Sequence, residues 1–196
     1  MSFISGKNRT AIPASEKGVA NGVATLDSGG DVPAAQLGNV ITLGTPTATT
    51  SGTSHDYTGI PSGTKKISIM IDGVSTSGTS VPIIQLGDSG GIETSGYKGA
   101  ASALYTGTAT ANHSSGFAFR DAWAAANIVH GLLILTLMDT TNNTWVINGN
   151  IGYSNLAFNM VLAGSKSLTS ELTQIRLTTV GGTDTFDAGS FNIQYE

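Results

Sequence analysis

Apolar and polar residues alternate along much of the chain, which is the period of a strand with one buried face. The clearest case is 65–71, where Ile67, Ile69 and Ile71 share one parity. Similar short segments recur between turns rich in Gly, Ser, Asn and Asp. This pattern predicts an all-β fold, an antiparallel jelly-roll-like β-sandwich of about eight to ten strands. The expected strands are 54–58, 65–71, 81–86, 92–98, 117–119, 130–138, 144–153, 156–162, 171–179 and 189–195.

Three segments depart from simple alternation. Residues 130–138 are apolar at both parities, which favours a central strand covered on both faces. Asp121 precedes an alanine-rich run and is placed to cap one or two helical turns through Ala126. Small residues dominate 99–115, so that stretch is expected to form either an edge strand or a mobile loop. None of these departures changes the predicted fold class.

The N-terminal part has a different pattern. Residues 17–38 carry isolated apolar residues between glycines and other small residues, too sparse to build a core. Asp27 to Asp31 contains paired glycines and predicts a tight turn, and Pro33 is expected to start a short helical turn through Leu37. Such a segment is stable only against partners. We therefore expect an extended assembly segment over 1–40, followed by a β-sandwich domain over 41–196.

The amino-acid composition excludes several classes of protein. The 196 residues include 26 Gly and no Cys, only 11% are charged, and the formal net charge is −4. A basic footprint for nucleic acid is lacking, and no apolar run is long enough to span a bilayer. The absence of Cys removes disulfides and thiolate metal sites. We expect synthesis in the cytoplasm without export.

The run KGVANGVATLDSGGDVPAAQL, residues 17–37, resembles a segment that recurs in bacteriophage fibre and tail-associated proteins. In that family it lies between a virion-attachment end and a β-rich distal domain, and a Lys is common where this chain has Asp31. The segments IQLGDSGGIETSGY (84–97) and IRLTTVGGTDTFDAGSFNIQYE (175–196) are similar to parts of phage fibre distal domains. The resemblance implies a homotrimeric virion fibre or spike whose β-domain faces outward.

The sequence leaves three hypotheses for the function of this protein. The leading hypothesis is a structural virion protein of a bacteriophage, a short trimeric tail fibre at the virion surface. Its N-terminal segment would bind a phage tail or capsid protein, and its distal domain would contact the host surface. The alternative is a head fibre or decoration protein on the capsid. The third is a surface-polysaccharide hydrolase, although we expect no enzymatic activity and no cofactor.

The pentapeptide Gly87-Asp-Ser-Gly-Gly91 equals the one around the nucleophilic serine of chymotrypsin-like proteases, and His55 and Asp72 precede Ser89 in that family's order. That family needs two barrels to bring its three residues together, whereas here each lies 17 residues from the next. Paired glycines between two strands are also a hairpin signal. The turn interpretation is therefore favoured, and we expect no catalytic residue here.

Other chemistry has weaker signals. The three His residues share no metal-ligand spacing, although His55 and Asp56 leave open a site formed across subunits. Asp and Glu lie mostly in turns, so a carboxylate pair for glycoside cleavage is not indicated.

Shallow glycan sites use exposed aromatic faces. Tyr97, Tyr105 and Trp123 are the candidate glycan-binding residues, with a structural role at a subunit interface as the alternative, whereas Trp145 alternates with Ile147 and is assigned to the core.

Overall fold

The computed structural model describes residues 15, 17–19, 23–33, 40–104, 110–157 and 159–196, and no α-helix occurs among them. The chain divides into two compact units, Met1–Val40 and Ile41–Glu196. This division falls at the boundary that the change in sequence pattern indicated. The short helical turn expected from Pro33 to Leu37 lies largely outside the described residues.

The N-terminal unit contains the tight turn that its paired glycines predicted. The Asp27 carbonyl accepts the Gly30 N–H at 3.1 Å, and its carboxylate oxygen Oδ1 accepts the Gly29 N–H at 2.8 Å. Gly30 has a φ of 88°, a left-handed conformation that favours glycine. Apolar side chains stay in solvent, with Val23 45% and Leu26 62% exposed. This part of the chain therefore does not bury its own apolar groups.

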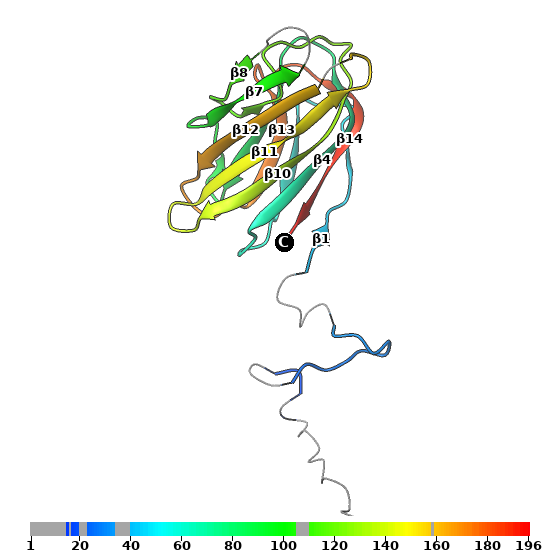
Figure 1. Ribbon diagram of the computed structural model, residues 1–196, viewed down its shortest axis with the longest axis vertical. Coiled ribbons are helices and arrows are strands. Elements are labelled where there is room, and N and C mark those ends of the chain that lie inside the picture. Colours follow the sequence, from blue (N-terminus) through cyan, green and yellow to red (C-terminus); the bar gives the residue numbers. More distant parts are fainter. Residues whose placement is uncertain (1–14, 16, 20–22, 34–39, 105–109, 158) are drawn as a thin grey trace, which may run out of the picture. The chain divides into compact units, whose positions relative to one another are not determined.

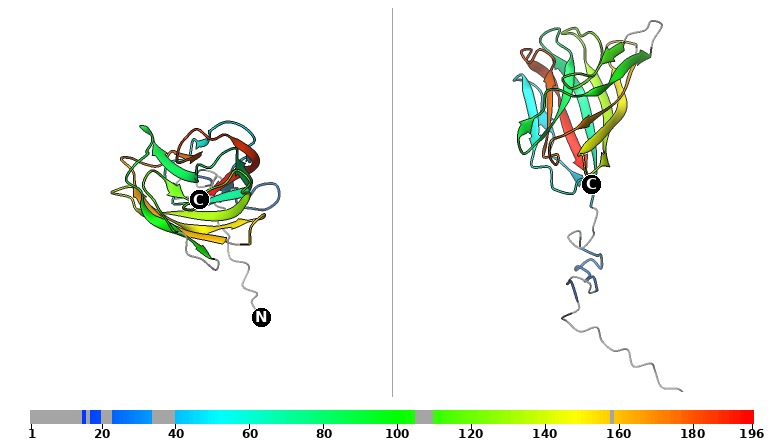
Figure 2. Two further views of the ribbon diagram at one scale, coloured as in Figure 1. Left: turned by 90° about the horizontal axis from the view of Figure 1, so that it is seen from above. Right: turned by 90° about the vertical axis from the view of Figure 1, so that its left-hand side faces the viewer.

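The C-terminal unit is a sandwich of two antiparallel sheets (Figure 1; Figure 2). Among the described residues the larger sheet has the order β1-β14-β4-β10-β11-β12-β7-β8, with β2 also paired to β14. The smaller sheet has the order β3-β13-β5-β6, with β9 paired to β5. The strands are β1 (Thr42–Leu43), β2 (Thr47–Ala48), β3 (Ser54–Thr58), β4 (Lys66–Thr76), β5 (Pro82–Asp88), β6 (Gly91–Ile92), β7 (Lys98–Leu104), β8 (Thr110–Asn112), β9 (Phe117–Ala118), β10 (Val129–Asp139), β11 (Thr144–Tyr153), β12 (Asn159–Ser167), β13 (Gln174–Thr179) and β14 (Phe186–Tyr195).

The core lies between the sheets and follows from the alternation. Ile67 and Ile69 of β4 and Leu133 and Leu135 of β10 are fully buried, and Trp145 of β11 is 2% exposed. Burying a large apolar side chain stabilises the fold by roughly 1.5–3 kcal/mol, which is why the register of these strands is strongly specified. The all-β sandwich is therefore confirmed, as is the core position of Trp145. Jelly-roll connectivity stays a prediction.

The two ends of the sandwich differ. At one end β1 pairs with the last residues of β14, Thr42 with Tyr195, so the chain enters this unit beside its C-terminus (Figure 1). At the other end the last residue of β4, Thr76, pairs with the first residue of β14, Phe186. The loops that follow Thr76 and precede Phe186 therefore lie at the end opposite β1. We call these the proximal and the distal end.

Three local expectations are corrected. Residues 121–126 are not helical: Trp123 points into the core, and Ser75 donates a hydrogen bond to the Ala125 carbonyl at 3.2 Å, so tertiary contacts outweigh the weak helix signal. The strand expected over 92–98 is reduced to β6, ending at Ile92. In this single chain, β10 is buried on one face only, because Leu132 is 46% exposed on the other.

The small-residue stretch 99–115 resolves toward the edge-strand alternative where it is described. β7 and β8 pair antiparallel, with Ala101 opposite Ala111, and β8 ends the larger sheet. The Gly99 position is crowded, since a Cβ there would lie 2.2 Å from the Ala163 carbonyl oxygen. Its φ of 128° also disfavours other residues. A glycine is therefore required where β7 begins.

Candidate functional site

Two adjoining grooves lie on the sandwich, the larger at its distal end and the smaller over strand residues of the smaller sheet. The larger is about 500 Å³ and the smaller about 320 Å³, and Ser115 and Val180 line both. These volumes lie in the range of small-molecule sites. The walls of the larger groove come from the loop after β4, from the start of β5, and from β8 and the residues that follow it. The smaller groove is lined by residues of β3, β5 and β13 and by the loop after β13. The larger groove is lined by Thr79, Ser80, Val81, Ile83, Thr110, Ala111, Asn112, Ser114, Ser115, Gly116, Ala118, Arg120, Asp121 and Val180.

Hydrogen bonds between loops hold the grooves open in a fixed form. The Ser80 N–H donates to Asp184 Oδ2 at 2.7 Å, and the Gly181 N–H donates to the Ser80 hydroxyl at 2.7 Å. Gln85 Nε2 donates to the Ser115 carbonyl at 2.8 Å and anchors the segment after β8. Because the walls are tied before a ligand arrives, less conformational entropy is lost on binding.

His113 anchors the same segment from the inside. Its ring is 5% exposed and packs edge-on against Phe117 with centroids 5.5 Å apart. Its Nδ1 accepts the Ala118 N–H at 3.1 Å. Burial lowers the pKa of His113, which keeps the imidazole neutral near pH 7. His113 therefore acts as a fixed internal support and not as a charged wall residue.

The charged part of the larger groove is Arg120 beside Asp121. Arg120 Nε lies 3.6 Å from Asp121 Oδ1, and the side chains are 15% and 35% exposed. The Arg120 guanidinium also lies over the Tyr153 ring, 5.5 Å from its centroid, a cation–π contact that fixes its position. Burial is the main reason that the pKa of Tyr153 rises to about 12, so the phenol stays neutral. Donors and an acceptor are thus presented side by side.

The smaller groove borders a second fixed pair. Arg176 Nε and Nη2 donate to the two carboxylate oxygens of Asp56, both at 2.7 Å. This bidentate geometry is the strong form of the Arg–carboxylate interaction. Asp56 therefore has an ionic partner within the chain, which weakens the open possibility that His55 and Asp56 form a cross-subunit metal site. No cluster of His, Asp or Glu suited to a metal ion occurs within the described ranges.

Two of the three aromatic residues predicted to bind a glycan, Tyr97 and Trp123, are buried. Tyr97 is 4% exposed, and its hydroxyl accepts the Leu86 N–H at 2.7 Å. Trp123 is 6% exposed, and its Nε1 donates to the Thr76 hydroxyl at 2.7 Å. Neither presents an open ring face, so both are corrected to core residues. Tyr105 lies outside the described residues. The groove residues are mostly short and lie on separate segments, so only their convergence in the fold identifies them.

The segment 87–91 is a hairpin turn, as its glycines predicted. Asp88 pairs with Gly91 where β5 turns into β6, and Ser89 Oγ lies 3.3 Å from Ser170 Oγ. The candidate triad partners have other neighbours. The His55 ring packs against Phe186 at 5.1 Å, and Asp72 Oδ1 lies 2.9 Å from His130 Nδ1. The described contacts therefore do not assemble a serine-protease triad.

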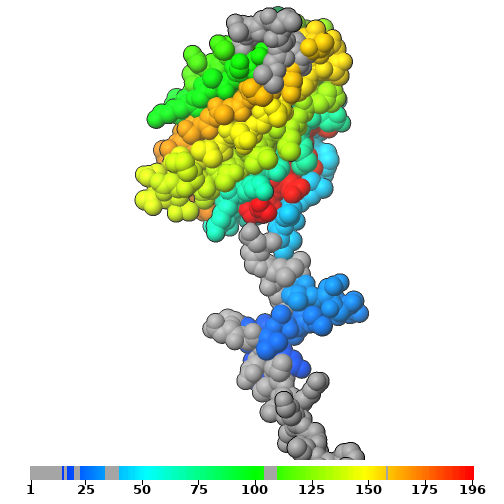
Figure 3. Space-filling model, in the orientation of Figure 1, coloured from blue at the N-terminus to red at the C-terminus, as the bar shows by residue number. Residues whose placement is uncertain are grey.

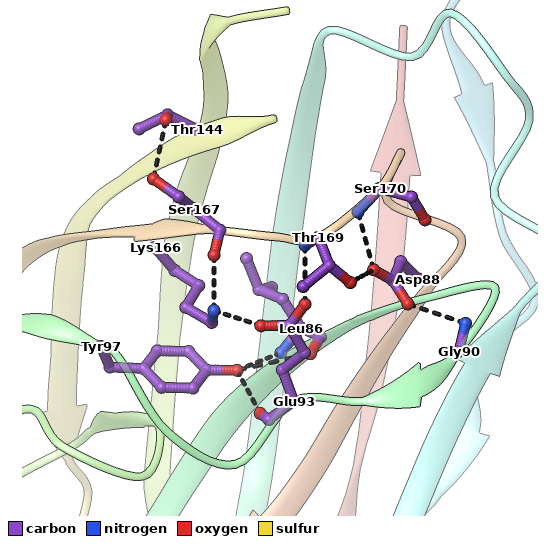
Figure 4. A network of polar contacts seen from close by, with 10 residues as sticks. All are labelled: Leu86, Asp88, Gly90, Glu93, Tyr97, Thr144, Lys166, Ser167, Thr169 and Ser170. Carbon is purple, nitrogen blue, oxygen red and sulfur yellow. Dashed lines mark hydrogen bonds and ion pairs between the residues drawn. The ribbon is translucent and has the colours of Figure 1, made fainter. Parts of the chain in front are cut away.

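Asp88 instead joins the turn to the connection between β12 and β13 (Figure 4). Its Oδ2 accepts the Thr169 hydroxyl at 2.6 Å and the Ser170 N–H at 2.8 Å. Its Oδ1 accepts the Gly90 N–H at 2.7 Å. These donors, the Thr169 hydroxyl first, lower the pKa of Asp88. The carboxylate therefore has a structural role at the proximal side of the sandwich.

A buried ion pair lies beside this turn. Lys166 pairs with Glu93, and the Lys166 ammonium lies 5.6 Å from the centroid of the Tyr97 ring (Figure 4). The other Glu93 oxygen, Oε1, accepts the Thr169 N–H at 2.8 Å. The charged groups of Lys166 and Glu93 therefore bind to each other and to the Thr169 backbone. The network fixes the β5–β6 hairpin against the end of β12.

Searches of protein-family models, of curated proteins and of solved structures found no match to this chain. Within the described residues, no helix is long and apolar enough to cross a membrane. The candidate site therefore rests on its own geometry. That geometry is a preformed polar groove at the distal end, rich in hydroxyl groups, with one Arg–Asp pair at its wall.

Proposed function

We propose that this chain is a structural virion protein of a bacteriophage, a short trimeric tail fibre or spike whose distal β-domain contacts the host surface. The resemblance of residues 17–37 to the fibre segment supports the protein class. The exposed Val19, Val23 and Leu26 support an assembly role for the N-terminal unit, since exposed apolar residues favour contact with a partner.

The observation that carries the proposal is the position of the grooves in the C-terminal unit. The chain enters that unit at the proximal end, where Thr42 pairs with Tyr195, and the larger groove lies at the opposite end. A protein tethered through its N-terminal side would present such grooves outward. This is the arrangement that receptor contact requires, because the binding face must point away from the attachment point.

The groove chemistry favours a saccharide as the surface ligand. Ser and Thr hydroxyls, the Asn112 amide and the Arg120–Asp121 pair offer donors and acceptors together, as vicinal sugar hydroxyls require. Hydrolysis is not favoured: Asp121 is the only carboxylate among the described residues that line the two grooves, whereas glycosidases use two. The groove is thus proposed to bind a glycan without cleaving it.

Binding of the labelled full chain to purified lipopolysaccharide and capsular polysaccharide of the host tests this. Arg120→Ala and Asp121→Asn should each weaken binding by about tenfold, the typical effect of losing one charged hydrogen-bonding group. Lys66→Ala is the control, because Lys66 forms an exposed ion pair with Glu196 at the proximal end. Equal binding by all variants, or shortening of the glycan, would contradict the proposed role.

The alternative, a head fibre or decoration protein of the capsid, fits the same structural features. An outward groove and an N-terminal attachment segment suit either location on the particle. Gold-labelled antibody against residues 41–196 distinguishes the two on intact particles by electron microscopy. Label at the tail supports the tail fibre, and label on the capsid supports the alternative.

A further inference from the structure

A bulge in β4 brings an Asp–Gly pair against a histidine of β10. The two strands lie side by side on the open face of the larger sheet (Figure 3). Their register shifts where His130 lies opposite two residues of β4, Asp72 and Gly73. Asp72-Gly73 is the only Asp–Gly dipeptide of the chain. Bulges of this kind take residues out of the regular ladder and redirect their polar groups.

Both bulge residues contact the same ring nitrogen of His130. The Gly73 N–H donates to His130 Nδ1 at 3.1 Å, and Asp72 Oδ1 lies 2.9 Å from that same atom. In a regular ladder this N–H would donate to a backbone carbonyl, which does not take up its proton. An unprotonated imidazole nitrogen is a base and does. The Asp72 carboxyl is thus held beside the N–H of the residue that follows it.

The two contacts together define a protonation state. Nδ1 accepts the Gly73 N–H only when that nitrogen carries no proton, and the Asp72 contact is then a hydrogen bond only when Oδ1 carries one. This state holds as many protons as an imidazolium beside a carboxylate. It places a neutral carboxyl group, which is an electrophile, next to a peptide nitrogen whose proton faces a base.

We propose that Asp72-Gly73 is a self-modification site, at which His130 moves a proton and an isoaspartyl linkage forms. His130 Nδ1 takes the Gly73 proton as the Gly73 nitrogen attacks Asp72 Cγ, and the new N–Cγ bond closes a five-membered ring. The same Nδ1 gives that proton to Oδ1, which already carries one. The Cγ–Oδ1 bond breaks, water leaves, and a succinimide remains. Water then opens the ring at either carbonyl and yields aspartate or isoaspartate.

The surroundings of the bulge suit each step. The Asp72 and His130 side chains are 84% and 44% exposed, so water reaches the ring that it must open. Gly73 has no side chain to crowd the attack on Cγ. It also falls between the paired residues on both sides of β4, where the registers with β10 and with β14 shift. The reacting N–H is therefore held by His130 and not by a neighbouring strand.

Peptide mapping of the incubated, folded full chain tests the proposal. Mass spectrometry detects the succinimide as the loss of one water, and protein isoaspartyl methyltransferase labels the isoaspartate. His130→Gln keeps an acceptor for the Gly73 N–H but does not take up its proton. It should slow product formation about tenfold, less than the roughly 10²–10⁴ of a base inside an enzyme site, because this pair is exposed. Asp72→Glu should abolish the signal, since a six-membered ring closes far more slowly.

A synthetic peptide of residues 67–77 separates the effect of the fold from that of the sequence, because it contains Asp72-Gly73 and lacks His130. Isoaspartate should accumulate faster in the folded chain than in this peptide. Thermal melting confirms that His130→Gln is folded. Equal rates in the wild type and a folded His130→Gln, or a slower rate in the folded chain than in the peptide, overturns the proposal.

Discussion

Lys166 and Glu93 form an ion pair inside the sandwich, with the Lys166 side chain 5% and the Glu93 side chain 21% exposed. Removing one partner of a buried pair leaves the other charge uncompensated. Glu93→Gln should therefore lower the free energy of unfolding by about 3 kcal/mol, measured by urea denaturation. The double variant Glu93→Gln, Lys166→Met should recover part of the loss. An unchanged urea midpoint in Glu93→Gln would show that the pair contributes nothing.

Asp88 should make the sandwich acid-sensitive. Hydrogen bonds, that of Thr169 first, hold its pKa below the ordinary value, so the native state prefers the ionised carboxylate. Its stabilisation is present above the ordinary pKa and is lost as the pH falls through the lower native value. The unfolding free energies of wild type and Asp88→Asn should differ at pH 7, and the difference should shrink as the pH falls below the ordinary range of a carboxyl group. A constant difference across this range would contradict the assignment.

The alternation of side chains was enough to predict much of the fold. The strand expected over 54–58 is β3 and that over 144–153 is β11. Alternate residues face inward in both: His55 and Tyr57 are half-buried in β3, and Trp145, Ile147 and Ile151 are buried in β11. The hydrogen bonds between distant polar residues could not be predicted from the sequence pattern. Thr169 contacts Asp88 across 81 positions of sequence, and the groove assembles from separate loops. Trp123 was misplaced because the small and polar residues around it in sequence do not show that its ring packs against Tyr153 and bonds to Thr76 in the fold.

The C-terminal strand should be integral to the sandwich. Phe191 and Ile193 of β14 are buried, and the strand pairs with β4 along its length. Deleting residues 189–196 should give insoluble or molten protein, since β4 would lose its neighbour and expose a sheet edge. Solubility and the cooperativity of thermal melting provide the measurement. A deletion variant that melts within about 3 °C of the full chain, a shift expected for only about 1 kcal/mol, would contradict this.

Glu196 makes more contacts than a frayed terminal residue. Its carbonyl accepts the Lys65 N–H at 2.8 Å, and its side chain lies 3.0 Å from the Lys66 ammonium. Removing Glu196 should therefore lower the free energy of unfolding slightly, by about 1 kcal/mol, because its backbone hydrogen bonds are lost. Glu196→Gln is the control, because it keeps those bonds and removes only an exposed ion pair.

Ser89 should be inert toward serine-directed reagents. Its hydroxyl lies beside Ser170, and His55 and Asp72 are engaged with Phe186 and His130. A fluorophosphonate probe should leave the folded chain unlabelled, and Ser89→Ala should behave as wild type. Labelling of the wild type that disappears in Ser89→Ala would show a nucleophile that the contacts do not support.

Incorporation into particles tests the central claim most directly. Purified virions can be probed with antibody against residues 41–196, comparing phage that carry the full chain with phage that carry a chain lacking residues 1–40. The full chain should copurify with particles and label their surface. The truncated chain should be soluble and folded, with a cooperative melt, and absent from particles. Absence of the full chain from purified virions, or normal incorporation of the truncated chain, would contradict the account.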